Sequence, residues 1–319
     1  LRENSLIYDK KQIIICSGGK QVIFNALMAT LNAQDEVVIT SPYWVSYPDI
    51  VNLCGGKPVI IKTNIANNFK VTVKELKQKF NSKTKWFIIN SPSNPSGTVY
   101  SKTELFAISK VLKLFPNINI ISDDIYEHII YESLPFYNLV QIDPQLKHRT
   151  LLVNGVSKGY AMTGWRLGYG LASENLIKAM TTVQSQSTSN ASTISQYAAI
   201  EALTGKQDFI ENNKLIYQNR RDQMLKILKE SRHLDILTPM GSFYALPSID
   251  RIIGKSTPNK KVLSSDTDFV FELLNNTGVA VVPGSAFGAK NTFRISYAVS
   301  ESLLEEACRL IVEFVDNLE

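Results

Sequence analysis

Short apolar runs alternate with longer amphipathic segments through the first half of the chain. The runs are rich in Ile, Val and Phe, which predicts strands that are buried on both faces, and the segments between them have the spacing of helices. The predicted strands are 12–15, 36–40, 57–62, 85–89, 118–122 and 150–153, and the predicted helices between them are 21–31, 43–53, 73–80 and 102–115. This order predicts an α/β fold with a mostly parallel sheet and helices on both of its faces.

The second half of the chain predicts a different arrangement. One long helical pattern at 208–229 is followed by a hairpin formed by 235–237 and 242–246, a polar loop at 251–266, a helix at 269–274 and a strand at 279–282. Ser300 reads as the N-cap of a last helix. Its predicted buried stripe is Leu303, Leu304, Ala307, Leu310, Ile311, Phe314 and Val315. We therefore expect a large domain at 1–207, an interdomain helix at 208–229 and a small C-terminal α/β domain at 230–319.

Composition narrows the class of protein. Hydrophobic residues make up 44% and charged residues 20% of the chain, as in ordinary globular proteins. The net charge of +5 is spread along the sequence, which does not favour a nucleic-acid partner. No apolar run reaches the roughly 18 residues of a membrane helix. The three cysteines and three histidines are scattered, which disfavours a disulfide framework or a metal site and fits the cytoplasm.

Residues that are suited to ligand binding or catalysis follow several predicted strands, where ligands of parallel sheets bind. Gly18, Gly19 and Lys20 come between the first strand and a helix, so their backbone N–H groups are available to a phosphate. A nucleotide-binding Walker loop is excluded because Gln21 replaces the required Ser or Thr. Taken alone, the segment is also compatible with a plain strand-to-helix turn.

Further strand ends carry an aromatic ring, an amide and a carboxylate. Trp44 can stack on a ring, although a buried packing role is equally open. Asn94 lies in a segment with turn-forming residues and is compatible with a simple turn. Asp123 can hold a protonated pyridine nitrogen and Tyr126 can donate to a phenolate oxygen, but an acidic helix N-cap is the alternative.

A lysine and an arginine follow the strand at 150–153. Lys158 sits in a tight turn, where a desolvated lysine amine is a nucleophile toward aldehydes, and Arg166 supplies a fixed charge for a phosphate. Together they indicate a covalently held phosphorylated aldehyde, which is pyridoxal phosphate. A lone pair of this kind would more simply be a surface lysine and a structural arginine.

The residues around this pair form a long pattern. They read Gly155-Val156-Ser157-Lys158-x-x-Ala161-Met162-x-Gly164-x-Arg166-Leu167-Gly168. The pattern resembles the cofactor-attachment signature of class I aminotransferases, which depend on pyridoxal phosphate. The segment at 42–48 is similar to that of the bacterial aspartate aminotransferase subgroup.

The resemblance implies a role for each residue at the strand ends. Lys158 would bind the cofactor, and Arg166 with the turn at Gly18 and Gly19 would hold its phosphate. Trp44 would cover the ring, Asn94 and Tyr126 would contact its phenolic oxygen, and Asp123 would hold its ring nitrogen.

The resemblance also implies how a substrate is held. Arg294 lies in an apolar strand, where an unpaired charge is costly, so it would bind the substrate α-carboxylate; pairing with an internal Asp or Glu is the alternative. The polar segment at 181–195 looks like a linker by composition, but the resemblance places it at a dimer interface. Vertebrate-type members carry an Arg in this segment that binds the distal carboxylate of the substrate, and 184–190 contains none. In the bacterial subgroup that this chain resembles, the Lys after the Gly-Gly turn has this role, so the resemblance makes Lys20 the candidate; an ordinary surface lysine is the alternative.

These inferences imply a cytoplasmic homodimer of fold type I, with active sites near the subunit interface. It would transfer an amino group between an L-amino acid, in the first place aspartate, and 2-oxoglutarate. Alternatives are an aromatic or prephenate aminotransferase, a lyase of the same fold, or an inactive remnant. The last arises because family members carry about 80 residues before this point, in line with a two-lobe size, and because the chain starts in what reads as the end of a helix.

Overall fold

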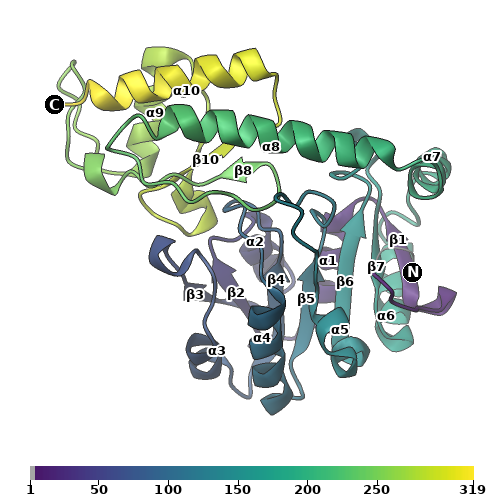
Figure 1. Cartoon of the computed structure of the whole chain (residues 1–319). Coiled ribbons are helices and arrows are strands. Elements are labelled where there is room, and N and C mark those ends of the chain that lie inside the picture. The colour runs from purple at the N-terminus through teal and green to yellow at the C-terminus, as the bar shows by residue number, and fades with distance from the viewer. Residues whose placement is uncertain (1–3) are drawn as a thin grey trace.

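The computed structural model describes residues 4–319, so the very start of the chain, where a helix end is expected, lies outside the described part. Two layers are evident in Figure 1: a large sheet flanked by helices, and above it a group of long helices over a small sheet. The strand ends that face the upper layer belong to elements far apart in sequence. This arrangement places the candidate residues between the two layers.

The large sheet contains seven strands in the order β1-β7-β6-β5-β4-β2-β3. They are β1 (Ile13–Cys16), β2 (Glu36–Ser41), β3 (Lys57–Lys62), β4 (Thr84–Asn90), β5 (Asn119–Asp123), β6 (Thr150–Gly155) and β7 (Gly168–Leu171). The neighbours from β3 to β6 are parallel, whereas β7 runs antiparallel to both β6 and β1. The predicted fold class, a mostly parallel α/β sheet, is confirmed.

Helices cover both faces of this sheet, as the continuous apolar strands predict. One face packs against α1 (Gly19–Thr30), α2 (Ser46–Leu53) and α6 (Glu174–Ser185). The other packs against α3 (Val73–Lys79), α4 (Lys102–Leu114) and α5 (Leu139–Ile142). In β2, Val37 and Ile39 face the first group and Val38 faces the second, because successive side chains of a strand point to opposite sides.

Two segments of the expected large domain differ from the sequence prediction. The helix expected from residue 43 starts at Ser46, since the backbone N–H of Tyr43 donates to the Phe287 carbonyl instead of entering the helix. The linker interpretation of 181–195 is wrong, because this segment contains the end of α6 and the start of α7 (Thr193–Thr204). Its Ser and Thr hydroxyls bond to carbonyls three or four residues earlier, which lets a polar segment remain helical.

The upper layer contains α8 (Asp208–Leu228), α9 (Asp266–Thr277) and α10 (Glu301–Asp316) around a small antiparallel sheet. Its strands are β8 (Tyr244–Ala245), β9 (Val282–Pro283) and β10 (Phe293–Ser296), with β10 in the centre. Helices α8 and α10 lie side by side (Figure 1) and share a buried apolar core with α9 and the small sheet. The division at 1–207, 208–229 and 230–319 remains a proposal.

Some predictions for this layer were wrong. The expected hairpin is reduced to a single bridge between Asp235 and Ser248, since β8 pairs with β10. Leu303, assigned to the buried stripe of α10, is 54% exposed, and Cys308 is buried instead. The loop at 251–266 is tied down by Ser256, whose backbone exchanges two hydrogen bonds with Glu319.

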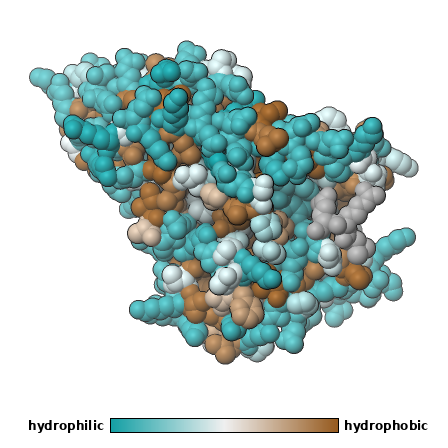
Figure 2. All heavy atoms as spheres, viewed as in Figure 1, coloured by the Kyte–Doolittle hydropathy of each residue, from teal (hydrophilic) through white to brown (hydrophobic). Residues whose placement is uncertain are grey.

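The surface is of mixed character. Figure 2 shows mainly hydrophilic residues on the visible face, with hydrophobic residues scattered among them. Within residues 4–319, none of the helices combines the length and hydrophobicity needed to cross a lipid bilayer.

Candidate active site

The strand ends converge on a cavity of about 430 Å³ between the two layers. Nine of the ten predicted site residues line it: Gly19, Lys20, Trp44, Asn94, Asp123, Tyr126, Lys158, Arg166 and Arg294. The tenth, Gly18, lies against the Arg166 guanidinium. The structure therefore brings together residues that are up to 276 positions apart in sequence (Gly18 and Arg294).

One end of the cavity is shaped for an anion. Gly18 is the N-cap of α1 with a φ of 97°, and a Cβ added to it would lie 2.5 Å from Nη2 of Arg166. A Cβ on Gly168 would collide with the backbone of Gly18 and Gly19. Gly18 and Gly168 thus let a helix N-terminus and a guanidinium approach each other closely, which is the arrangement that binds phosphate.

Asp123 is the last residue of β5 and lies opposite Asn90 of β4. Its Oδ2 accepts a hydrogen bond of 2.6 Å from the Tyr47 hydroxyl, and its Oδ1 accepts one of 3.4 Å from the Ile125 N–H. Burial raises the pKa of Asp123 to about 6, although these two donors and the charge of Lys158 oppose the rise. The helix N-cap alternative is wrong, because turns and not a helix follow Asp123.

Lys158 follows β6 and points its amine into the cavity. Nζ lies 5.8 Å from the ring centroid of Tyr126 and 5.5 Å from that of Phe243. Burial is the main cause that lowers the pKa of Lys158, and the positive charges of Arg294 and Arg166 lower it further. A lysine in this environment is more readily neutral, and therefore nucleophilic, than an exposed one.

Arg294 of β10 is held between two aromatic rings, with its guanidinium 4.4 Å from the centroid of Tyr244 and 4.8 Å from that of Phe287. Its Nη1 donates to Oδ1 of Asn94 at 3.0 Å. Among the described residues, its buried Nε has no hydrogen-bond partner and no acidic side chain forms an ion pair with it. The alternative of an internal carboxylate partner is therefore not supported there, and the guanidinium retains a donor for an incoming acceptor.

Lys20 is the second residue of α1 and lies beside Trp44. Its Nζ lies 5.0 Å from the centroid of the Trp44 ring. Lys20 is exposed and also lines the cavity, so its role toward a distal carboxylate stays a prediction. Its ammonium is a second cation, in addition to Arg294, that a dicarboxylate can contact.

Several lining residues were not identified from the sequence, and three of them carry polar groups that bond within the site: Tyr47, Asn90 and Tyr244. Asn90 ends β4, so the rule about strand ends was a usable signal; its amide donates to the Asp123 carbonyl and accepts from the Asn94 N–H. Tyr47 and Tyr244 act through contacts with Asp123 and Arg294 that only the folded chain reveals.

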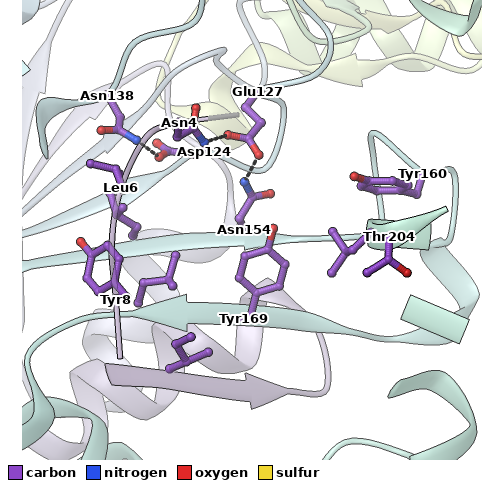
Figure 3. A pocket seen from close by; sticks show the side chains of 14 residues that line it. Asn4, Leu6, Tyr8, Asp124, Glu127, Asn138, Asn154, Tyr160, Tyr169 and Thr204 are labelled. Carbon is purple, nitrogen blue, oxygen red and sulfur yellow. Dashed lines mark hydrogen bonds between the residues drawn. The ribbon is translucent and has the colours of Figure 1, made fainter. Parts of the chain in front are cut away.

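A second cavity, also of about 430 Å³, lies beside β6 and β7 and is lined by the residue that follows Asp123 (Figure 3). There Asn138 donates to Asp124, and Asn4 and Asn154 both donate to Glu127. Of the described residues that line it, none carries an amine or a guanidinium. It therefore offers no group that reacts with an aldehyde or binds a phosphate, in contrast to the first cavity.

Comparison with known proteins agrees with this geometry. Residues 1–311 match the family model for aminotransferase class I and II. The chain belongs to this aminotransferase family. It is 52% identical to the probable aspartate/prephenate aminotransferase of Rickettsia felis, over 96% of this chain and 75% of that protein.

Two solved structures are also similar to this aminotransferase. The aspartate aminotransferase of Rhizobium meliloti has a TM-score of 0.97 at 47% identity, covering 100% of this chain and 80% of that one. An aspartate aminotransferase of Thermus thermophilus, solved with maleate, has a TM-score of 0.90 at 37% identity, covering 98% and 78%. The predicted enzyme class and the resemblance to aspartate aminotransferases are confirmed, and the family generally depends on pyridoxal phosphate.

Proposed function

We propose that this aminotransferase uses pyridoxal phosphate bound to Lys158 and transfers the amino group of aspartate to 2-oxoglutarate. The observation that carries the proposal is one cavity that contains the Lys158 amine, the buried Asp123 carboxylate and the Arg294 guanidinium. The same cavity has an anion cradle, formed by Gly18, Gly168 and Arg166. Each of these groups matches one part of the cofactor or of the substrate.

The residues present fit the cofactor. The close approach of Gly18, Gly168 and Arg166 suits its phosphate, Lys158 suits its aldehyde, and Asp123 suits its protonated ring nitrogen. Trp44 would cover the ring, and Asn94 and Tyr126 would contact its phenolic oxygen. When bound, the cofactor supplies an electron sink that acidifies the substrate Cα–H.

The protein's own residues would then bind the substrate and move one proton. Arg294 would bind the α-carboxylate through the donors that Asn94 leaves available, which fixes the direction of the Cα–H bond. Lys158, once its amine is released by the incoming amino acid, would accept that proton and return it. Its lowered pKa favours the neutral amine that this task needs.

Lys20 would bind the distal carboxylate of aspartate or 2-oxoglutarate. Its Nζ lies beside the Trp44 ring at the cavity wall. The Thermus thermophilus relative is described with maleate, which is a dicarboxylate. Prephenate also carries two carboxylates, and the Rickettsia felis relative is named for both substrates. We therefore propose prephenate as a second substrate that uses the same two cations.

We also propose a homodimer in the cytoplasm, with the active sites near the interface. Ile194 and Tyr197 of α7 are 81% and 71% exposed, and Ile200 follows on the same side of the helix. A second copy of the chain would bury these apolar side chains. Cys16, Cys54 and Cys308 are free, buried thiols, as expected of a reducing compartment.

The deciding experiment is the visible absorption spectrum of the full chain with pyridoxal phosphate, before and after aspartate is added. We expect a band of lysine-bound cofactor that disappears with aspartate and returns with 2-oxoglutarate, with glutamate as a product. Lys158→Ala removes the amine and should abolish the band. A band that ignores aspartate but responds to another amino acid would refute the substrate, and absence of a band from the unmodified chain would refute the cofactor.

A further inference from the structure

Tyr47 lies between two residues of the site and contacts both. It belongs to the first turn of α2 and is only 2% exposed. Its ring meets Trp44 edge to face, with the centroids 5.3 Å apart and an interplanar angle of 86°. Its hydroxyl reaches Oδ2 of Asp123 at 2.6 Å. One side chain therefore connects the ring that would cover the cofactor with the carboxylate that would hold its nitrogen.

The direction of this hydrogen bond has a chemical consequence. A phenol is far less acidic than a carboxylic acid, and burial together with the charge of Asp123 raises the pKa of Tyr47 well above its usual value. The phenol therefore keeps its proton and donates, while the carboxylate accepts. Donation to a charged acceptor stabilises the charged form.

We propose that Tyr47 is a positioning residue whose hydroxyl keeps the Asp123 carboxylate charged and aimed at the cofactor's ring nitrogen. The inference rests on the proposed function, because it assigns the ring nitrogen of pyridoxal phosphate to Asp123. A charged carboxylate keeps the proton on the pyridine nitrogen, which maintains the electron sink. A neutral Asp123 would hold that proton itself and leave the pyridine uncharged.

Asp123 needs such a donor because its surroundings oppose a negative charge. Burial raises the pKa of Asp123, and the Tyr47 hydroxyl is the strongest of the influences that oppose the rise; the net value is about 6. The titratable groups around Asp123 are Tyr47 on α2, Asp124 and Tyr126 in the following turns, and Lys158 after β6. Removing the hydroxyl leaves only the Ile125 N–H and the charge of Lys158 to oppose the effect of burial on Asp123.

The first measurement follows the Asp123 carboxyl by NMR in the full chain without cofactor, using labelled aspartate and Asp123→Asn to assign the signal. In Tyr47→Phe we expect its titration midpoint to rise by about 1 to 2 pH units, the effect of losing one hydrogen bond to a charged group. Tyr100→Phe is the matched control, since Tyr100 is also buried and its hydroxyl accepts one bond, from the Val71 N–H. A midpoint that does not move in Tyr47→Phe would overturn the proposal.

The second measurement follows the ring nitrogen of isotopically labelled pyridoxal phosphate bound to each variant. We expect its chemical shift to move toward the unprotonated value in Tyr47→Phe but not in Tyr100→Phe, and kcat for aspartate to fall with little change in KM. If the titration midpoint of the Asp123 carboxyl moves but the chemical shift of the ring nitrogen does not, Tyr47 affects Asp123 only in the absence of cofactor, and the proposal fails. If the unmodified chain binds no cofactor, the proposed function fails first, a distinct outcome that also removes this role.

A variant that keeps the packing provides an independent test. Site-specific 3-fluorotyrosine at position 47 has a more acidic phenol and is a stronger donor, so the Asp123 midpoint should fall, opposite to Tyr47→Phe. If the Asp123 midpoint shifts equally and in the same direction in Tyr47→Phe and in the 3-fluorotyrosine variant, the cause is packing, and the proposal is contradicted.

Discussion

At the scale of single residues, we expect Lys20 to decide which substrates the cavity accepts. Its Nζ and the Arg294 guanidinium are both cations of the cavity wall, and only a dicarboxylate would use both. In Lys20→Gln we expect kcat/KM for aspartate to fall about 10- to 100-fold, the cost of one charged hydrogen bond. The value for alanine, which lacks a distal carboxylate, should change little in a steady-state assay.

Lys102→Gln is the control for this prediction, because Lys102 also lies over an aromatic ring, that of Tyr137, but outside the cavity. It should leave both substrates unaffected. An equal loss for aspartate and alanine in Lys20→Gln would show that Lys20 supports the cofactor or the fold, and would remove it from substrate recognition.

Most candidate residues were accessible to sequence reasoning because of their position after strands. Asp123 is the last residue of β5 and Lys158 comes shortly after β6, so the parallel-sheet rule places them at one edge. Tyr47 was not accessible, since its role is a hydrogen bond to a residue 76 positions away that no local pattern encodes. The choice for Arg294 between substrate and internal partner also required the structure, which shows its buried Nε without a partner among residues 4–319.

At the scale of elements, the junction of α1 with β7 controls the anion cradle. A Cβ on Gly168 would lie 2.6 Å from the Gly18 carbonyl carbon and would also strike the backbone nitrogen of Gly19. Because backbone cannot move aside as a flexible side chain does, we expect Gly168→Ala to cost about 1 to 3 kcal/mol of stability. It should also weaken binding of pyridoxal phosphate at least about tenfold, by displacing the α1 N-terminus.

Thermal unfolding and titration with the cofactor measure both effects. Gly164→Ala is the matched control, since a Cβ there meets nothing within 4 Å and the residue lies in the same loop before β7. Wild-type affinity in Gly168→Ala would show that the close approach of α1 and β7 is unnecessary for the cofactor.

Predictability also differs between elements. The starts of α3 and α4 are encoded locally, as Thr72 with Glu75 and Ser101 with Glu104 form capping boxes. The hairpin predicted near residue 240 failed because β8 finds its partner in β10, about 50 residues further along the chain, with Tyr244 opposite Ser296. Pairing over such a distance depends on the packing of α8, α9 and α10, which local alternation does not report.

At the scale of the whole molecule, the exposed side of α7 predicts the oligomeric state. Ile194, Tyr197 and Ile200 recur at intervals of three residues on the solvent side of this helix. We expect the unmodified chain to be a dimer in light scattering after gel filtration, and Ile194→Lys with Tyr197→Lys to shift it toward the monomer. Charges buried without partners oppose association.

Leu114→Lys is the control for surface charge, because Leu114 is an exposed apolar residue of α4, 64% accessible and far along the chain from α7. It should leave the elution unchanged. A dimer that survives the α7 substitutions would place the interface elsewhere, and a monomeric unmodified chain would contradict the dimer itself.

The packing of Arg294 between Tyr244 and Phe287, with Nη1 occupied by Asn94, has a consequence for selectivity. The guanidinium is immobilised during folding, so the entropy of ordering a long side chain, about 2 kcal/mol, is not charged to substrate binding. An amine that lacks a carboxylate gains nothing from this order, because it brings no acceptor for the N–H groups of the guanidinium. Decarboxylated analogues of amino acids are therefore discriminated against by the rigidity of one residue, before any difference in reactivity is expressed.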